Sequence, residues 1–352
     1  MTIIIGNQPV SQLPDTVAEI YKSYPFLEAE ALKLVQTPLH VIDKPEGVLY
    51  VTQKEYAVLN SGDENFSIVG TDDATTCHIV VLVNREESST CVAHIDSTDD
   101  LEEELARMVF DVLGQQNMNS DFHLELNIMG GYCDEMHKSE VLTLDLLHFY
   151  NQLPVKFQLK SLCVGSVNTR SSNGINWPIM YGVAVNIQSD FIFCPAKFNL
   201  SVRGPSLSLR SSRFLSRQCL IDRVYHSKEG IFKISPFNYR FQSQMVEWAH
   251  KSDDFILNNF STSPAVEPEH FSKEMKEVFQ FIIHNPFPMA SIFKFNKSLK
   301  YVPSPQGQWF FYPLEVLRSD LCPIFSHFLS FKSTSCFIAT TAVMNGALMN
   351  VD

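Results

Sequence analysis

Two short apolar runs constrain the fold of this chain more than any other feature. Residues 79–83 form an uninterrupted run of strand length that is rich in β-branched side chains. Residues 90–95 form a second such segment, and the polar residues 84–89 between them are suited to a hairpin loop. Because β-branched side chains favour extended backbone, the sequence predicts a buried antiparallel hairpin at this point.

The other periodic segments predict a mixture of helices and strands. Residues 15–35 have the pattern of two short amphipathic helices that break at Pro25. Residues 99–113 carry apolar side chains at helical spacing, and acidic residues occupy the first turns, where the helix dipole favours negative charge. We also expect a helix over 139–150 and strands over 47–51, 66–69, 122–128, 156–164, 179–187 and 191–193.

The order of these elements predicts the fold class. Strands at hairpin spacing, without regular βαβ units, indicate an α+β fold in which a mixed or antiparallel sheet sandwich is flanked by helices. We expect residues 1–312 to form a single catalytic domain. Residues 313–352 have neither a helical nor a strand period, so their structure as a C-terminal tail is left open.

Charge and composition exclude several classes of partner. The formal net charge is −12, which argues against a nucleic-acid partner because such proteins display a basic face. Four arginines occur close together, and we interpret them as a solvated surface: Arg203, Arg210, Arg213 and Arg217. We expect no signal peptide and no membrane span. The chain therefore reads as a soluble intracellular protein, expected to be a monomer although the sequence does not fix the oligomeric state.

The cysteines argue against a metal site. None of the eight lies in a C-x-x-C motif or at zinc spacing from histidine. The sequence also has no glycine-rich phosphate loop of the known patterns, and Gly130-Gly131 after a strand is best interpreted as a turn. We expect no metal and no cofactor. In a reducing compartment most of these thiols should be buried, which leaves room for one reactive cysteine.

Cys77 is the candidate for that reactive thiol. It lies where the polar, turn-rich segment 70–76 enters the first strand of the hairpin, a rigid place that still faces solvent. The hairpin would bring His94 beside Cys77, within reach of a thiolate–imidazolium pair. Thr71, Thr75 and Asp96 are close enough in sequence to orient the imidazole. His78 is adjacent to the thiol, so its side chain should point to the opposite face of the sheet.

The spacing alone also fits a buried structural cysteine and histidine. Residues 72–82, however, closely resemble the active-site segment of the protein N-terminal asparagine amidohydrolase family. Three more stretches are similar to that family in the same order: 129–131, 178–187, and 261–264 together with 267–271. The similarity runs from the N-terminal helices to about residue 310, whereas 203–217 match poorly and the final forty or so residues have no counterpart.

The resemblance implies a function and roles for the residues. An N-terminal asparagine side chain would lose ammonia through a thioester on Cys77, with His94 as the base, and the product would enter the arginine branch of the N-degron pathway in the cytoplasm or nucleus. A more distant resemblance to bacterial chemoreceptor glutamine deamidases, in fold and in Cys-to-His spacing, makes Thr71 the third member of a triad.

Selection of a chain terminus requires a group that recognises the free α-ammonium, and a carboxylate is the obvious partner. Asp72, Asp73 and Asp96 are the candidates, although the first two also suit loop capping. Two other functions stay open: deamidation of internal Gln or Asn, and a catalytically silent module that binds Asn termini. The segment 261–264 is interpreted as an ordered turn or as a contributor to the site.

Overall fold

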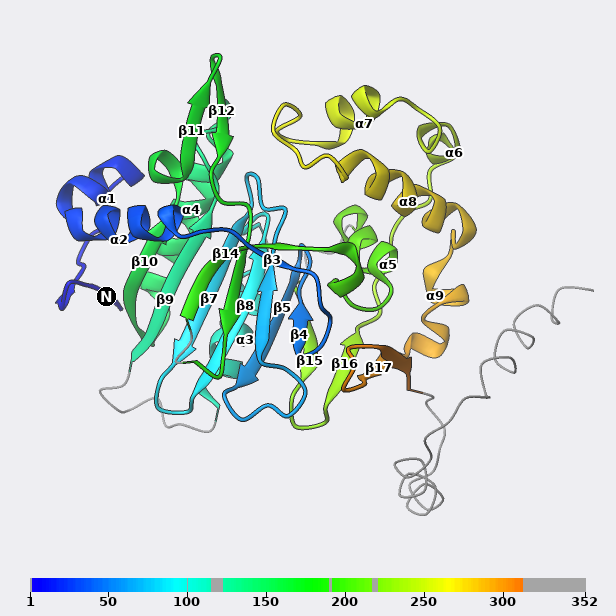
Figure 1. Cartoon of the computed structure of the whole chain (residues 1–352), viewed down its shortest axis with the longest axis horizontal. Coiled ribbons are helices and arrows are strands. Elements are labelled where there is room, and N and C mark those ends of the chain that lie inside the picture. The colour runs from blue at the N-terminus through cyan, green and yellow to red at the C-terminus, as the bar shows by residue number, and fades with distance from the viewer. Residues whose placement is uncertain (1, 100, 115–122, 190–191, 217–220, 313–352) are drawn as a thin grey trace, which may run out of the picture. The chain divides into compact units, whose positions relative to one another are not determined.

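The computed structural model describes residues 2–99, 101–114, 123–189, 192–216 and 221–312 (Figure 1). The tail 313–352 lies outside these residues, as do Phe122 at the start of a predicted strand and Arg217 of the arginine cluster.

The predicted hairpin forms the centre of an eleven-stranded sheet. Strands β7 (His78–Asn84) and β8 (Ser89–Ile95) are antiparallel and buried along their whole length. β5 (Glu55–Asn60) pairs with β8, and β9 (His123–Gly130) pairs with β7, both antiparallel. β10 (Lys156–Cys163) continues the sheet parallel to β9. The outer strands are β1 (Ile3–Ile5) and β2 (Gln8–Pro9) on one side, and β15 (Asp222–His226), β16 (Ile231–Ile234), β17 (Leu299–Pro303) and β18 (Trp309–Phe311) on the other.

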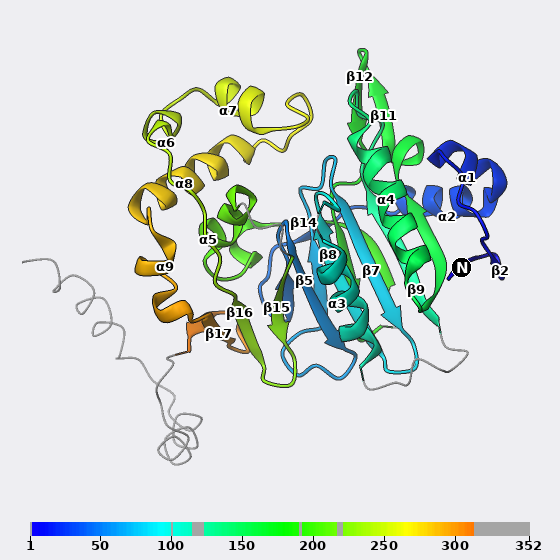
Figure 2. The same ribbon diagram turned by 180° about the vertical axis from the view of Figure 1, so that it is seen from behind.

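A second, five-stranded sheet covers one face of the large sheet (Figure 1). Its order is β3 (His40–Ile42), β14 (Ile192–Phe198), β13 (Val183–Asn186), β6 (Ile68–Thr71) and β4 (Val48–Tyr50). The helices α3 (Glu102–Leu113) and α4 (Lys138–Gln152) cover the opposite face (Figure 2). The central strands are therefore buried on both faces, which explains why they read as continuous apolar runs.

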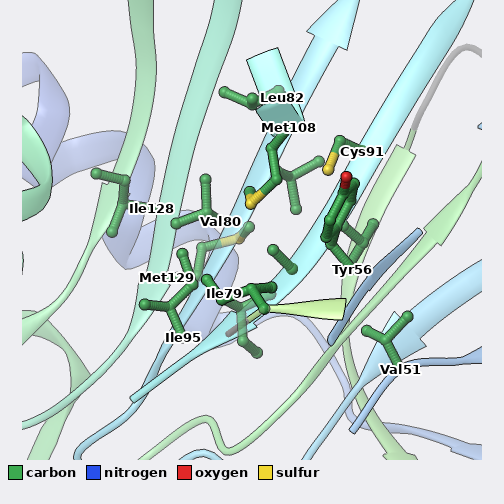
Figure 3. Packing of buried hydrophobic residues seen from close by; sticks show 14 of the residues in the cluster. Val51, Tyr56, Ile79, Val80, Leu82, Cys91, Ile95, Met108, Ile128 and Met129 are labelled. Atoms are coloured by element: carbon green, nitrogen blue, oxygen red, sulfur yellow. The ribbon is translucent and has the colours of Figure 1, made fainter. Parts of the chain in front are cut away.

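The core between the large sheet and α3 is closely packed. Met108 of α3 lies among Val80, Leu82 and Cys91 from the central hairpin (Figure 3). Successive side chains of a strand point to opposite faces, so Cys77 and Ile79 point away from this layer and toward the second sheet. The catalytic candidates accordingly lie between the two sheets.

Helices and a small hairpin surround the end of the sheet at which β7 begins and β8 ends (Figure 1). α1 (Val17–Ser23) and α2 (Pro25–Gln36) lie beside β10. The two-stranded sheet of β11 (Thr169–Ser172) and β12 (Ile175–Pro178) projects at one side. On the other side lie the helices α5 (Leu207–Ser211), α6 (Gln244–Trp248), α7 (Asp253–Phe260), α8 (Phe271–His284) and α9 (Pro288–Ser291). Short 3₁₀ turns cover Gly165–Asn168, Leu200–Val202, Ser212–Leu215 and Lys294–Asn296.

The predicted α+β class, the two N-terminal helices and the central hairpin are confirmed. The strand β5 was not predicted, because Glu55 at its start gives the segment a polar pattern although that carboxylate is fully buried. The strand expected over 179–187 is limited to Val183–Asn186. Residues 179–182 instead run past the segment before Cys77, where the Tyr181 carbonyl accepts a hydrogen bond from the Ala74 N–H at 2.9 Å.

The interpretation of the arginine cluster as a solvated surface is wrong for its three described members. Arg203, Arg210 and Arg213 are 3%, 0% and 2% exposed. Each pairs with a carboxylate far away in the sequence, and no sequence period shows such pairing. Among the described residues, no helix is long and apolar enough to cross a lipid bilayer.

Candidate active site

Cys77 immediately precedes β7, and its half-buried side chain lines a cavity of about 200 Å³. His94, near the end of β8, lines the same cavity. In the antiparallel register His94 lies opposite Ile79, so Cys77 is its diagonal neighbour on the same face of the sheet. Diagonal pairs of this kind lie within side-chain reach. The hairpin therefore brings the predicted nucleophile and base into one cavity.

Thr71 orients the imidazole from the opposite sheet. It is the last residue of β6, and its Oγ1 lies 2.8 Å from His94 Nδ1. Both side chains are buried, so this hydrogen bond is shielded from water. Because Nδ1 is engaged, Nε2 is the nitrogen that can exchange a proton with a group in the cavity. Thr75 lines the cavity as well, but no hydrogen bond joins its side chain to His94 in the described structure.

Burial keeps both reacting groups neutral in the free protein. It raises the pKa of the Cys77 thiol well above its usual value, and the charges of Asp96 and Glu267 raise it further. Burial also lowers the pKa of His94 to about 4, although the charge of Asp96 opposes this. The expected thiolate–imidazolium pair is therefore disfavoured.

Asp72 has a structural environment. Its Oδ1 accepts a hydrogen bond from Tyr50 Oη at 2.9 Å, and its Oδ2 accepts one from the Phe198 N–H at 2.6 Å. Arg203 Nη2 lies 3.1 Å from Oδ1 and 3.3 Å from Oδ2. The side chain is 2% exposed. Although Asp72 borders the cavity, both of its oxygens are occupied, so it is a poor candidate for binding an ammonium group.

Asp73 is the more accessible of the two neighbouring carboxylates. Arg203 Nη1 lies 2.6 Å from its Oδ2, and His270 Nε2 lies 2.8 Å from the same oxygen. Burial opposes ionisation, but the hydrogen bond from His270 and the charge of Arg203 outweigh it and lower the pKa of Asp73. In the described structure both contacts go to Oδ2, and the residue lines the cavity.

Two glutamates add to the acidity of the cavity. Glu267 lies on the loop between α7 and α8, and Ser261 Oγ donates a hydrogen bond to its carboxylate. Burial and the charge of Asp73 raise the pKa of Glu267 to about 7, although the bond from Ser261 opposes this. Glu274, on α8, lies 3.3 Å from Arg203 Nη1. Asp72, Asp73 and Glu274 all contact the Arg203 guanidinium, and Glu267 lines the same cavity, so acidic side chains predominate there.

Asp96 is absent from the residues that line the cavity. It follows β8, and its Oδ2 accepts a hydrogen bond from Gln53 Nε2 at 2.7 Å. Lys54 Nζ lies 3.7 Å from the same oxygen. Of the three predicted ammonium-binding candidates, Asp73 is therefore the one that lines the cavity and, in the described structure, has its contacts on a single oxygen.

The side chains Asp73, His270 and Glu274 have ligand atoms within 4.8 Å of one another, as a metal site requires. Arg203 Nη1 already contacts both carboxylates. Because a guanidinium supplies the positive charge here, a cation would have to displace or repel it. The arrangement therefore fits an ion-pair network better than a metal centre.

A second buried network fixes the wall of the cavity formed by α5 and the turn after it. Glu55 lies directly opposite His94 in the ladder between β5 and β8. Arg210 Nη2 lies 2.6 Å from Glu55 Oε2, and Arg213 Nη1 lies 2.8 Å from Oε1. Residues of the same segment, Leu207 and Phe214 among them, line the cavity. These ion pairs thus connect the segment that carries Arg210 and Arg213 to β5, the strand that pairs with β8 opposite His94.

Sequence reasoning missed Arg203, Glu267, His270 and Glu274 as members of the site. The family-like stretches 261–264 and 267–271 were the available signal, since both border the cavity through Ser261, Thr262, Glu267 and His270. Thr262 Oγ1 also lies 3.0 Å from Thr76 Oγ1, which ties this segment to the residue before Cys77. The poor match of 203–217 offered no corresponding signal for Arg203.

A half-buried thiol, an imidazole oriented by a hydroxyl and an acidic cavity are the groups that a cysteine-dependent hydrolase uses. Comparison with known proteins shows an amidohydrolase family. Residues 39–310 match the family model described as protein N-terminal asparagine amidohydrolase, and this chain belongs to that family.

Three relatives carry the same description. Those of Homo sapiens and Mus musculus are each 33% identical to this chain over 309 residues, which covers 88% of the chain and 97% of each relative. The relative of Arabidopsis thaliana is 29% identical over 264 residues, which covers 68% of the chain and 74% of the relative.

Proposed function

We propose that this chain removes the side-chain amide of an N-terminal asparagine in proteins or peptides, giving aspartate and ammonia. The observation that carries the proposal is that Cys77 and His94 share one cavity, in a chain of this family. The hydrogen bond between Thr71 Oγ1 and His94 Nδ1 adds to it. The cavity of about 200 Å³ is smaller than the pockets of about 300–1,000 Å³ that hold drug-sized ligands, which suits a single terminal residue.

The chemistry begins with a neutral thiol. As Cys77 Sγ attacks the carboxamide carbon, His94 Nε2 takes the thiol proton and the carbonyl becomes an oxyanion. Backbone N–H groups around Cys77 would stabilise this oxyanion, and losing one such donor typically costs about 100-fold or more in rate. The proton on His94 then passes to the nitrogen, ammonia leaves, and a thioester remains on Cys77.

Hydrolysis of the thioester reverses the proton movement. His94 takes a proton from a water molecule, whose oxygen attacks the thioester carbon. The bond to Sγ then breaks, the thiol regains the proton from His94, and the terminal side chain is released as a carboxylic acid. Thr71 would keep the ring in one orientation through both steps, so we assign it as the third member of the triad.

Recognition of the chain terminus is assigned to Asp73, with Glu267 as a second carboxylate of the same cavity. The described contacts of Asp73 go to Oδ2 alone, and acidic side chains outnumber basic ones around the cavity, which favours an α-ammonium group. An internal asparagine has no such charge and would not gain this attraction, so it should bind more weakly than an N-terminal asparagine. We therefore expect Asp73→Asn to raise KM for an Asn-starting peptide far more than it lowers kcat.

We propose further that the product enters the arginine branch of the N-degron pathway, as the sequence resemblance implies, and that the protein acts in the cytoplasm or nucleus as a monomer. We also propose that residues 1–312 are the catalytic domain and that the sheet sandwich is of the Cys–His deamidase type. A size-exclusion and light-scattering measurement of the full chain tests the monomer, and activity after truncation at Tyr312 tests the domain boundary.

The decisive experiment uses four short peptides that begin with Asn, Gln, acetyl-Asn, or Ala followed by an internal Asn. Ammonia release and a gain of about one dalton in mass are followed for the wild type and for Cys77→Ser. Release from free N-terminal Asn alone, lost in Cys77→Ser, is the expected result.

The other outcomes separate the alternatives. Release from the internal-Asn or acetyl-Asn peptide would favour a deamidase of internal residues and refute the ammonium-recognition argument. Binding without release by the folded wild type would identify a silent binding module. The Gln peptide measures side-chain selectivity, since one methylene in a pocket discriminates by only about 1–3 kcal/mol.

A further inference from the structure

His78 follows the nucleophile but points to the opposite face of the sheet. It is fully buried, and its Nε2 lies 2.6 Å from Thr143 Oγ1 on α4. The Thr143 hydroxyl in turn donates to the Ser139 carbonyl, one turn earlier in the helix, at 2.9 Å. Burial lowers the pKa of His78 to about 4, although the Thr76 carbonyl opposes this, so the ring is neutral near neutral pH. His78 is not among the residues that line the cavity, so it can act on the site only by holding the backbone.

Two glycines let the end of β9 approach the same point. Gly130 lies opposite His78 in the ladder between β7 and β9 and has a φ of +97°. A Cβ at Gly130 would lie 2.8 Å from the Cys77 carbonyl oxygen, and one at Gly131 would lie 2.6 Å from His78 Cε1. The Gly-Gly pair is thus more than a turn. It lets backbone pack directly against the carbonyl of Cys77 and the ring of His78.

Asn168 extends this support around the nucleophile. It is fully buried, and its side-chain amide donates to the Gly131 carbonyl at 2.9 Å and to the Met180 carbonyl at 3.1 Å. Its Oδ1 accepts from the Met180 N–H at 2.8 Å. Tyr181 follows Met180, and its carbonyl accepts the hydrogen bond from the Ala74 N–H on the segment that leads to Cys77. The backbone is therefore held both before and after the thiol.

We propose that His78 is a positioning residue of the deamidation reaction, and that its contacts with Thr143 and Gly131 fix the backbone of Cys77 relative to His94. The inference rests on the proposed role of Cys77 as nucleophile. Cys77 precedes the first ladder residue of β7, so the sheet alone does not hold it. A reacting group must be held within about 0.5 Å of its productive position, and a misplacement of about 1 Å can lower the rate by about 100-fold.

The test changes α4 and leaves the cavity untouched. Thr143→Val keeps the shape of the side chain but removes the hydroxyl, whereas Thr143→Ser keeps the hydroxyl and is the matched control. We expect Thr143→Val to lower kcat on an Asn-starting peptide by about 10- to 100-fold with KM nearly unchanged, and Thr143→Ser to stay near the wild type. The alkylation rate of Cys77, followed by mass spectrometry across pH, should change in Thr143→Val and not in Thr143→Ser.

Several outcomes would overturn the inference. A folded Thr143→Val with wild-type kcat and alkylation would do so, as would a rise in KM with kcat unchanged. If Thr143→Val fails to fold, Thr143→Ala removes the same hydroxyl with less bulk and is judged by the same criteria. Cys77→Ser distinguishes a failure of the proposed nucleophile from a failure of the His78 inference. Activity in Cys77→Ser would refute the role of Cys77 as nucleophile. An inactive Cys77→Ser together with a fully active Thr143→Val would refute only the role of His78.

Discussion

The hydrogen bond between Thr71 and His94 offers the sharpest test of the proposed triad. Thr71→Val replaces the hydroxyl with a methyl group of similar size, so the packing between the two sheets is preserved. The bond is 2.8 Å long and both side chains are buried, so water cannot replace the lost partner of Nδ1. We therefore expect the imidazole to lose its fixed orientation while the fold is retained.

The magnitude follows from the burial of the pair. A buried polar group left without its partner costs about 1–3 kcal/mol. Each 1.36 kcal/mol is tenfold in rate, so if the whole penalty is felt in the transition state, kcat/KM falls by about 5- to 150-fold. Thr71→Ser keeps the hydroxyl and loses only a methyl group. It should therefore retain most of the activity.

The assay is ammonia release from an Asn-starting peptide, measured over a range of substrate concentrations for the wild type and both variants. Far-UV circular dichroism and thermal unfolding establish that each variant is folded. A folded Thr71→Val enzyme with kcat/KM within about twofold of the wild type would show that this bond does not orient the catalytic base. Equal losses in the Val and Ser variants would instead point to packing.

Three further predictions concern stability. Arg210→Met should destabilise the fold by about 3–5 kcal/mol in denaturant unfolding, because it leaves the fully buried Glu55 with one arginine partner in place of two; a loss below about 1 kcal/mol would contradict this. Gly131→Ala should destabilise the fold by more than the roughly 1–2 kcal/mol that a left-handed backbone costs a residue with a side chain, because the new Cβ would also meet the His78 ring. Gly174→Ala is the control, since Gly174 also has a positive φ but a Cβ there would meet open space; it measures the backbone cost alone. Burial raises the pKa of Glu267 from 4.5 to about 7, so the folded state binds more protons than the unfolded state between these values and stability should fall as pH rises through that window. Glu267→Gln should flatten the slope, and an unchanged slope would remove this carboxyl group as its source.

The sequence predicted that Cys77 and His94 lie together but not their protonation state. The hairpin could be inferred because two β-branched runs and a polar loop are local features, and the loop length sets the register that places Cys77 beside His94. The pKa values of both groups depend on burial between two sheets, which no local pattern reports. A thiolate–imidazolium pair was therefore a reasonable expectation from the residues, and the burial disfavours it.

The strand β5 and the buried arginines are also features that local sequence patterns did not predict. Glu55, Arg210 and Arg213 are polar residues in sequence, and each alone would be placed at the surface. They are buried because their charges neutralise one another across more than 150 positions of the chain, with sequence separations of 155 and 158 residues. Pairing over such a distance is a property of the tertiary structure alone.

The sequence by itself determined the elements whose physics is local: the buried hairpin, the amphipathic helices and the placement of a thiol where a polar loop enters a strand. The tertiary structure decided how two neighbouring acidic side chains are occupied. Asp72 and Asp73 have the same chemistry, yet contacts from Tyr50, Phe198 and Arg203 take both oxygens of the first, whereas the described contacts of the second go to Oδ2. A side chain's partners are set by where distant segments pack, and that information is absent from its position in the chain.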